Sequence, residues 1–452
     1  MKRTHRRRWQ AAAIMTVAAL AVAACSSNSS SSSGPGAGSS SSGGALTASA
    51  PGITPTQILI GSHQPLTGPA APGYSEIAPA ANAYFSHVNA NGGVYGRKIV
   101  YKYLDDGYDP TKTSSVVHEL VLQDNVYALF NGLGTPTHLA TVSFLNAQKV
   151  PDVFVASGCE CWNDPSKYPD TFGWQLDYVR EGKILGQYVK QHFAGKKVAY
   201  FYQNDEFGLD GVKGLDYEIP SSMVVSRQTY VPTNVNITPQ VAAMRASGAQ
   251  VVVGFSIPAF TALLKLDSLK VGFSPALVVS SVGTDPITLA GLVQAFAKQG
   301  GKNLNGNQLI NGIITDEYLP ALSTSDSWYV LFKKVHDQYE PKAPLDGNFF
   351  YGMAVGYTFV QAMFNAGRNP TRADLVSAVQ GGMPQGPAVA PYSYSSSNHA
   401  GITGAYMGVI QNGVVVQQGS VLVTDASASG AITTYSGTEQ QAPASGIPTA
   451  SH

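Results

Sequence analysis

Residues 127–156 read YALFNGLGTPTHLATVSFLNAQKVPDVFVA, and this stretch decides the fold. The apolar run Tyr127 to Phe130 predicts a buried strand, and a second apolar run predicts another strand from Val153 to Ala156. Between them, the spacing of the apolar residues indicates a helix from about Thr137 to Ala147. A strand, a helix and a second strand in this order form a βαβ unit, whose parallel strands need helices on both faces of the sheet. We therefore expect an α/β fold.

The same alternation of strand and helix patterns extends in both directions along the chain. Upstream, the predicted elements are the strands Ile58–Ile60 and Ile99–Tyr103 and the helices Ser75–Asn89 and Thr111–Leu122. The pattern restarts after Phe172 with helix Glu181–Phe193, strand Lys197–Tyr202, helix Pro239–Ser247, strand Val251–Phe255 and strand Leu277–Ser281. Such a restart predicts two similar α/β lobes. Ligands of doubly wound sheets bind at the carboxyl ends of the strands, so we expect a cleft between the lobes.

The first 24 residues have the pattern of a secretory signal. A segment with five lysines and arginines precedes the apolar run Ala11 to Ala24, which is shorter than the roughly 20 residues that cross a bilayer. The run ends in Val22-Ala23-Ala24-Cys25, which resembles the lipobox of bacterial lipoproteins. This resemblance implies that residues 1–24 are cleaved off as a signal peptide and that the thiol of Cys25 receives lipid. An ordinary signal peptide followed by a chance cysteine is the alternative.

Segments of low complexity flank the body of the chain. Residues 26–44 are almost entirely Ser, Gly, Ala and Pro, so we expect residues 25–52 to form a lipidated cysteine and a flexible tether. Residues 425–452 are similar in composition and predict a disordered tail. Without residues 1–24 the chain has 23 basic and 28 acidic residues, a net charge of about −5, which argues against nucleic acid as a partner.

Two cysteines remain once Cys25 is assigned to lipid. Cys159 and Cys161 could oxidise to a tight disulfide outside the cell, although so short a span strains the bond, and free thiols are the alternative. A metal site is disfavoured because Asp164 is the only obvious additional ligand downstream. We expect neither a metal nor a cofactor.

The turn Asn131–Thr137 lies between a predicted strand and a predicted helix. Its glycines permit close approach to the backbone, and the start of the helix offers unpaired N–H groups to an anion, to which Thr135 and Thr137 add hydroxyls. A dinucleotide site is excluded because the third glycine of the Gly-x-Gly-x-x-Gly pattern is missing. The alternative to an anion site is a turn that caps the helix and binds nothing.

Several stretches in a characteristic order cover nearly the whole body, from about Ile53 to Gly419. They are Gln64–Pro69 (QPLTGP), Asn89–Lys98 (NANGGVYGRK), Asp105-Asp106 with Asp109-Pro110, Gly132–Thr137, Phe201–Gly211 (FYQNDEFGLDG) and Tyr351–Gly367. In order and spacing they resemble the type I periplasmic binding proteins of the branched-chain amino acid transporter family.

The resemblance implies two Rossmann-like lobes, joined by three crossover strands, that close over a solute by a hinge motion. Lobe one would comprise residues 53–178 and 318–385, and lobe two residues 179–317 and 386–424. In lobe two, Ala405 to Gln418 is predicted to form a hairpin around Asn412-Gly413.

The resemblance also implies a ligand carboxylate held by two loops of lobe one. These correspond to Leu133-Gly134-Thr135 and Ala156-Ser157-Gly158. Thr135 matches the serine or threonine of the family. The second loop departs from the pattern, because Gly158 stands at the usual hydroxyl position and Ser157 would have to replace it.

The family's glutamate for the ligand ammonium has no counterpart at its expected place in this chain. The corresponding stretch runs from Ser280 to Asp285, in which Ser281 and Asp285 are the candidate ligand-binding residues. A buried ammonium without a carboxylate partner is costly. The further candidate ligand-binding residues are Tyr74, Asp205, Phe207, Phe255 and Ser256.

These observations predict a monomeric solute-binding lipoprotein of an ABC importer, anchored to the outer face of the cell membrane, that delivers a small organic solute to a permease. The solute would be a branched-chain or other apolar amino acid, or an aromatic or aliphatic carboxylate or amide. A lipoprotein that senses a ligand and signals to a membrane receptor is the alternative. An extracellular hydrolase is disfavoured, because the chain has no Gly-x-Ser-x-Gly elbow and His118-Glu119 lacks the second histidine of a zinc motif.

Overall fold

The computed structural model describes residues 44–451. The predicted signal peptide, the lipidation site Cys25 and most of the tether therefore lie outside the described residues. Within the described part of the chain, none of the helices combines the length and the apolar character that crossing a membrane requires.

The first sheet has five parallel strands in the order β2-β1-β3-β4-β5. Its strands are β1 (Gln57–Gln64), β2 (Lys98–Asp105), β3 (Leu129–Phe130), β4 (Asp152–Val155) and β5 (Thr171–Gly173). Its helices are α1 (Ala71–Tyr74), α2 (Ile77–Ala90), α3 (Pro110–His118), α4 (Thr135–Leu139), α5 (Val142–Ala147), α12 (Ser327–Tyr339), α13 (Gly347–Ala366) and α14 (Arg372–Gln380). A short π-helical segment (Glu119–Gln123) continues α3.

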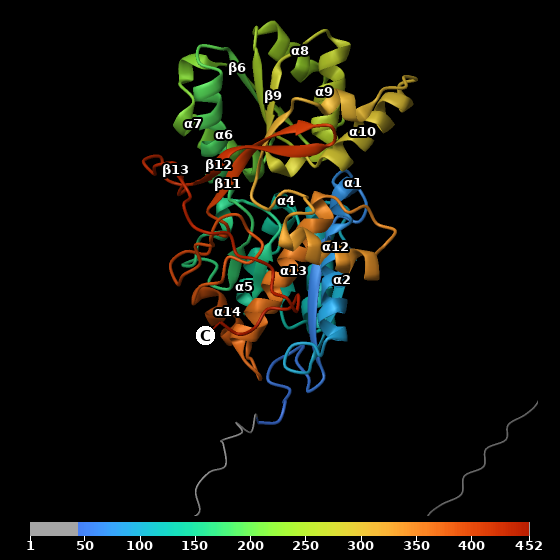
Figure 1. The fold of residues 1–452 in the computed structure, drawn as a ribbon, viewed down its shortest axis with the longest axis vertical. Coiled ribbons are helices and arrows are strands. Elements are labelled where there is room, and N and C mark those ends of the chain that lie inside the picture. The colour runs from blue at the N-terminus through green and yellow to red at the C-terminus, as the bar shows by residue number, and fades with distance from the viewer. Residues whose placement is uncertain (1–43, 452) are drawn as a thin grey trace, which may run out of the picture. The chain divides into compact units, whose positions relative to one another are not determined.

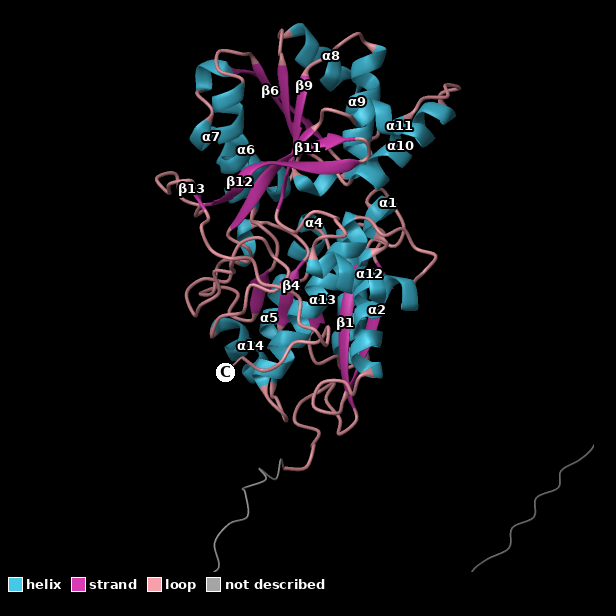
Figure 2. Ribbon diagram, in the orientation of Figure 1, coloured by secondary structure: helices cyan, strands magenta, loops and turns pink. Residues whose placement is uncertain are grey.

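Apolar residues on the two faces of this sheet belong to different clusters. Leu129 packs with Val117 and Leu145, which come from α3 and α5. The next residue of β3, Phe130, contacts the rings of Phe85 in α2 and Phe359 in α13. Because neighbouring residues of a strand point to opposite faces, both faces of this sheet are buried. Figure 2 shows the strands enclosed by helices.

The βαβ unit predicted from residues 127–156 is present with one difference. The expected single helix Thr137–Ala147 is divided into α4 and α5 at Thr141, whose φ of −125° is not helical. The Thr141 hydroxyl donates to the His138 carbonyl at 3.0 Å, a local bond that competes with the regular helical pattern.

The second sheet has eight strands in the order β13-β12-β11-β10-β9-β8-β6-β7. Five strands are parallel, namely β6 (Val198–Gln203), β7 (Val224–Tyr230), β8 (Val251–Phe255), β9 (Ala276–Val279) and β10 (Ile314–Glu317). The antiparallel strands are β11 (Gly404–Gln411), β12 (Val414–Val423) and β13 (Thr433–Thr434). The accompanying helices are α6 (Tyr178–His192), α7 (Glu206–Glu218), α8 (Thr238–Ala246), α9 (Pro258–Lys270), α10 (Pro286–Gln299) and α11 (Gly306–Ile310).

The predicted hairpin between β11 and β12 turns at Asn412-Gly413, where both residues have positive φ, 52° and 82°. Two consecutive positive φ values are typical of the type I′ turn, which suits the twist of antiparallel strands. Two mainly parallel sheets with covering helices confirm the α/β fold that the sequence predicts.

The chain passes between the two sheets at three places before its C-terminal segment. It passes from β5 to α6, from β10 to α12, and from α14 to β11. In Figure 1 the second sheet with α6–α10 lies above the first sheet with α2, α5 and α13. The residues at these passages, rather than the interior of either sheet, are placed to act as hinges.

The structure differs from the sequence-based expectation at the C-terminal end. Residues 425–451 have defined contacts instead of forming a disordered tail. β13 pairs with β12, after which the chain runs along helices of the first sheet (Figure 1). There the Trp328 indole donates to the Gln440 carbonyl at 2.6 Å, and the Tyr84 hydroxyl donates to the Gly446 carbonyl at 2.9 Å. Composition did not reveal this, because backbone carbonyls accept many of the bonds and only a few apolar side chains, including Ile447, join the core.

Candidate functional site

A cavity of about 100 Å³ lies between the two sheets. Eight of the predicted ligand-binding residues line it: Tyr74, Leu133, Gly134, Thr135, Ala156, Phe207, Ser281 and Asp285. Residues of both predicted lobes contribute to its wall. Sequence reasoning thus selected part of the lining, while several tyrosines and one glutamate of the wall were missed.

The turn from β3 to α4 forms one end of the cavity. Thr135 is the first residue of α4, and no side chain caps this helix. The Thr135 and Ser157 hydroxyls are 2.7 Å apart, so Thr135 lines the cavity while Ser157, which is buried behind it, supports its orientation. A pair of linked hydroxyls can donate a hydrogen bond to a ligand oxygen.

Two details of this turn correct the prediction. The N–H of Gly134 donates to the Ala156 carbonyl at 3.1 Å, so it is not free for an anion. The Thr137 hydroxyl, expected to add a donor, bonds the Leu133 carbonyl at 2.6 Å and is fully buried. Thr135 is therefore the hydroxyl of this turn that the cavity exposes.

A chain of four fully buried ionisable groups supports the turn from below. Asp106 Oδ2 is 2.8 Å from His63 Nδ1, His63 Nε2 is 2.9 Å from His138 Nδ1, and His138 Nε2 is 2.7 Å from Asp152 Oδ2. Burial lowers the pKa of His63, against the opposing effect of Asp106. Gly132 lies directly on the two imidazoles, since an added Cβ would be 2.5 Å from His63 Nε2. The glycine therefore serves packing here rather than access for a ligand.

The cavity wall also contains acidic side chains. Glu317, the last residue of β10, is partly exposed to the cavity, and burial together with the charges of Asp285 and Glu181 raises its pKa to about 8. Asp285 also lines the cavity, but its Oδ1 accepts from the Thr288 N–H at 2.7 Å and its Oδ2 from the Gly347 N–H at 2.8 Å. Asp285 thus caps α10 and links it to α13.

Ser281 contacts a buried pair of carboxyl groups behind this part of the wall. Its N–H and hydroxyl donate to Glu181 Oε1 at 3.0 and 2.9 Å, and the N–H also contacts Asp316 Oδ1 at 3.1 Å. Burial and the neighbouring Glu181 charge raise the pKa of Asp316 well above its usual value. Two carboxyl groups this close share a proton rather than both ionising. The polar groups of Ser281 are therefore engaged within the protein.

Aromatic rings form most of the remaining wall. They belong to Tyr74, Tyr108, Tyr178, Phe207, Tyr318 and Tyr351. The centroids of the Tyr178 and Phe207 rings are 4.6 Å apart. Phe255, which the sequence suggested as a wall residue, is fully buried behind these two rings and does not line the cavity.

Three other predicted residues are not brought to the cavity wall. Asp205 caps α7 through the Phe207 N–H and accepts from the Gln203 amide. The Ser256 hydroxyl is buried and bonds Thr261 at 2.8 Å. The Gly158 carbonyl accepts from the Tyr178 N–H at 2.7 Å, which fixes the start of α6. Each has a structural role that the sequence pattern alone could not distinguish from ligand binding.

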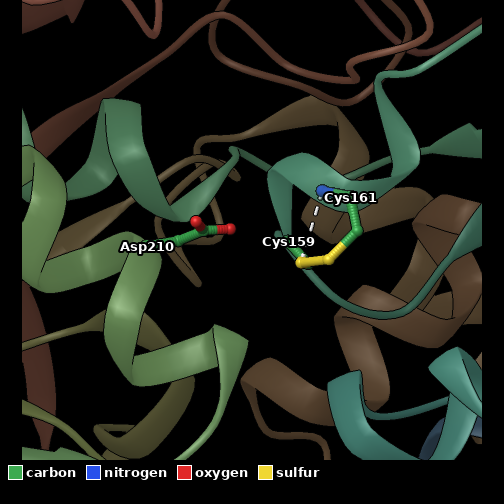
Figure 3. Close-up of side chains that lie close together, drawn as sticks. All are labelled: Cys159, Cys161 and Asp210. Atoms are coloured by element: carbon green, nitrogen blue, oxygen red, sulfur yellow. Dashed lines mark hydrogen bonds between the residues drawn. A yellow bond between two sulfur atoms is a disulfide. The ribbon is translucent and has the colours of Figure 1, made fainter.

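The question left open for the two cysteines is answered by a disulfide between Cys159 and Cys161, whose Cα atoms are 5.0 Å apart. Both sulfurs lie within 4.8 Å of a carboxylate oxygen of Asp210, which points toward them (Figure 3). Bonded sulfurs have no thiolate, so this group is unsuited to a metal ion.

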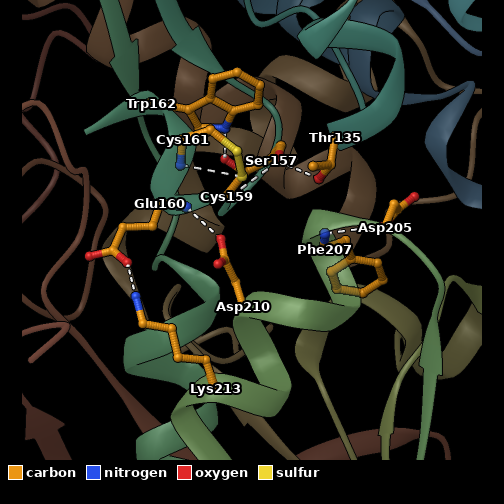
Figure 4. Close-up of a disulfide and its surroundings, with 10 residues drawn as sticks. All are labelled: Thr135, Ser157, Cys159, Glu160, Cys161, Trp162, Asp205, Phe207, Asp210 and Lys213. Carbon is orange, nitrogen blue, oxygen red and sulfur yellow. Dashed lines mark hydrogen bonds and ion pairs between the residues drawn. A yellow bond between two sulfur atoms is a disulfide. The ribbon is translucent and has the colours of Figure 1, made fainter. Parts of the chain in front are cut away.

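The disulfide-containing turn contacts α7 of the second sheet (Figure 4). The Glu160 N–H donates to Asp210 Oδ2 at 2.8 Å, and Lys213 Nζ is 2.7 Å from Glu160 Oε2. Ser157 joins this turn to Thr135 in the cavity wall, because its hydroxyl contacts Thr135 and accepts from the Cys159 N–H at 3.2 Å. The turn therefore connects the cavity wall to the facing lobe.

Two α/β units that meet around a cavity, with three chain passages between them, define a bilobal solute-binding protein. The family model described as periplasmic binding protein matches residues 57–414, and the chain belongs to this family. Its members are substrate-binding proteins rather than enzymes, so the expectation that the chain is not an enzyme is confirmed by its family.

The alignments with sequence relatives cover only part of this chain and part of each relative. Leu/Ile/Val-binding protein homolog 7 of Brucella abortus is 26% identical over 254 residues, covering 53% of this chain and 61% of that protein. Leu/Ile/Val-binding protein BraC3 of Rhizobium johnstonii is 26% identical over 159 residues, covering 33% and 41%. The chain thus spans about three fifths or less of these curated relatives.

Solved structures share the fold over most of the chain. A branched chain amino acid ABC transporter protein from Thermus thermophilus with bound valine has a TM-score of 0.71 at 18% identity and covers 82% of this chain and 97% of its own. A fatty acid ABC transporter substrate-binding protein from Thermomonospora curvata has a TM-score of 0.72 at 20% identity and covers 84% and 96%. Identities this low establish the fold alone.

Proposed function

We propose that this chain is an exported solute-binding lipoprotein of an ABC importer, anchored to the outer face of the membrane through Cys25. It captures a small organic solute between its two lobes and delivers it to the permease. The observation that carries this proposal is the cavity between the carboxyl ends of the two sheets, where Thr135 offers a hydroxyl at one end and aromatic rings form the walls.

Closure of two lobes, residues 53–178 with 318–385 and residues 179–317 with 386–424, accounts for several contacts across the cavity. The Tyr74 hydroxyl donates to the Val282 carbonyl, and the Gln203 amide donates to the Tyr108 hydroxyl at 3.2 Å. Together with the Asp285–Gly347 bond they join opposite walls. A ligand that contacts both walls favours the closed state, which presents the surface that the permease recognises.

The size of the cavity supports a small ligand. Typical ligand pockets measure roughly 300–1,000 Å³, whereas this one is about 100 Å³ in the closed arrangement. An apolar amino acid or a short carboxylate or amide suits this volume better than a long acyl chain.

A thermal-shift screen of amino acids, amides and short aliphatic and aromatic acids tests the proposal. A true ligand at 100 times its Kd stabilises the native state by about 2.7 kcal/mol and raises the Tm. The same ligand is expected to lower the radius of gyration in solution scattering. A rise in Tm without compaction would contradict capture by hinge closure.

The anchor is tested separately. The full chain, expressed in a bacterium that lipidates exported proteins, is expected in the membrane fraction and labelled by a radioactive fatty acid. Cys25→Ala is expected to remove the label and release the protein, and Cys25→Ala protein that still fractionates with membranes would contradict anchoring through Cys25.

A further inference from the structure

The cavity wall contains two carboxyl groups and no basic side chain among the described residues. Asp285 and Glu317 are its ionisable carboxyl groups, and none of the described residues that line it is lysine, arginine or histidine. An anionic ligand would find the Thr135 hydroxyl and two acidic side chains in this wall, but no cation. Simple carboxylates are therefore poorly matched to the whole cavity.

Glu317 differs from the other acids of this region in having no protein partner. Both Asp285 oxygens accept backbone N–H groups, and Glu181 accepts from Ser281. Among residues 44–451, neither a hydrogen bond nor an ion pair engages the side chain of Glu317, although it lines the cavity. A partly buried carboxylate with no partner is costly unless a ligand supplies a positive charge.

The neighbouring walls suit the same kind of ligand. Tyr318 follows Glu317 in the chain, and the rings of Tyr74, Tyr178 and Tyr351 also line the cavity. The faces of aromatic rings attract ammonium groups, and this attraction is stronger away from water.

We propose that Glu317 binds the positively charged group of the ligand, so that the ligand is a small zwitterion or organic cation whose ammonium lies at the end of β10. If the ligand also has a carboxylate, the Thr135 hydroxyl in the same cavity wall binds it. This inference rests on the proposed function and specifies its substrate class. Glu317 in β10 would then do the work of the ammonium-binding glutamate that has no counterpart in the stretch from Ser280 to Asp285.

The groups around Glu317 support this assignment. It faces Asp285 at the start of α10, Glu181 in α6, Asp316 in β10 and Tyr406 in β11, none of which is basic. Its pKa of about 8 means that most molecules hold a proton there at pH 7 in the absence of ligand. An ammonium ligand binds the ionised form, so binding releases that proton and becomes tighter as the pH rises toward 8.

Matched triplets of ligands test the proposal by isothermal titration calorimetry. One triplet is leucine, 4-methylpentanoate and 3-methylbutylamine, and the other is phenylalanine, 3-phenylpropanoate and 2-phenylethylamine. In the unchanged protein, the amino acid or the amine of a triplet is expected to bind at least about tenfold more tightly than the deaminated acid. Affinity for that ligand is expected to rise about tenfold between pH 6 and pH 7, with release of nearly one proton.

Glu317→Gln is the diagnostic variant, and Glu340→Gln, at the end of α12 and outside the cavity lining, is its matched control. Glu317→Gln should weaken binding of the amino acid or amine about 30-fold or more and leave the deaminated acid unchanged. Glu340→Gln should change neither. The pH dependence and proton release of the unchanged protein need no variant and keep the test decisive if Glu317→Gln does not fold.

The outcomes separate this inference from the proposed function. Equal or tighter binding of a deaminated acid, or a neutral amide as the only ligand found in the thermal-shift screen, overturns the role of Glu317 while leaving a solute-binding protein. Unchanged affinity in Glu317→Gln does the same. If no solute of either the screen or the triplets binds, the proposed function itself is contradicted.

Discussion

At the scale of single residues, we expect the Thr135 hydroxyl to bind the anionic group of a ligand. Thr135→Ala removes its hydroxyl and leaves Ser157 without its partner at 2.7 Å. A hydrogen bond to a charged group contributes about 1.5–3 kcal/mol, so the Kd of a carboxylate-bearing ligand should rise about 10- to 100-fold in calorimetry. Thr135→Ser keeps a hydroxyl and should bind nearly as the unchanged protein does. Undiminished affinity in Thr135→Ala would remove the anion role from this turn.

A row of four hydrogen-bonded side chains is buried beneath the Asn131–Thr137 turn. Its hydrogen bonds need more protons than two neutral histidines supply. Three hydrogen bonds join Asp106, His63, His138 and Asp152 in series, and each bond needs one proton. Two neutral imidazoles provide two protons, so a third is held within the group, and its net charge is −1.

Gly132 should tolerate no side chain above these imidazoles. In Gly132→Ala the Cβ would lie 2.5 Å from His63 Nε2 and 2.7 Å from His138 Nδ1. The resulting displacement should lower the free energy of unfolding by about 1–3 kcal/mol, measured by urea denaturation. Gly291→Ala, in exposed α10 with no atom within 4 Å of its Cβ, is the control and should stabilise by about 0.5–1 kcal/mol. Equal stability of the two variants would contradict the packing role.

Cavity residues that lie in a local sequence pattern could be predicted, whereas those that reach the cavity only through the tertiary fold could not. Thr135 follows a glycine-rich turn after a buried strand, a local pattern that the sequence displays. Glu317 is recognisable only once β10 is known to end at the cavity, since an acid after an apolar strand is otherwise an ordinary surface residue. Asp205 and Ser256 had suitable chemistry, but helix capping and hydroxyl pairing use the same residue types.

At the scale of elements, the disulfide-containing turn holds the cavity wall against α7. Cys159→Ser with Cys161→Ser removes the cross-link, whose very short loop limits its stabilisation to about 1–2 kcal/mol. The Tm of the oxidised protein should therefore fall by a few degrees. Ligand affinity should fall as well, because the backbone between Ser157 and Glu160 is no longer held in place by the cross-link.

A chemical check accompanies this prediction. A chain beginning at Ser26 should show no free thiol after denaturation and alkylation, and two after reduction, by mass spectrometry. The oxidised protein treated with reductant should reproduce the Tm of the double variant. A higher Tm of the reduced protein would show that the bond opposes, rather than supports, the closed arrangement.

Helices and strands were predicted correctly where the apolar residues follow one clear period. The prediction failed where a side chain forms a hydrogen bond to the local backbone. The strands Val251–Phe255 and Lys197–Tyr202 correspond closely to β8 and β6. The helix expected from Thr137 to Ala147 was interrupted, because the Thr141 hydroxyl bonds the His138 carbonyl. Apolar periodicity reports which face is buried, but it carries no information about such side-chain bonds to the backbone.

At the scale of the whole described body, the C-terminal segment is a further connection between the two sheets. β13 pairs with β12 in the second sheet, and residues 440–449 then contact α12, α2 and α13 beside the first. Three chain passages allow a hinge, whereas a fourth connection on the surface restrains it. The segment is thus positioned to favour the closed arrangement.

Deleting residues 438–452 tests this restraint. The deletion removes the acceptors of Trp328, Tyr84 and Gln361, so the free energy of unfolding should fall by roughly 2–4 kcal/mol. The ligand-free protein should also have a larger radius of gyration in solution scattering, because the lobes open more readily. Deleting only His452 is the control and should change neither quantity. Since opening competes with ligand capture, the long deletion should also weaken binding, and tighter binding would mean that the segment restrains closure instead.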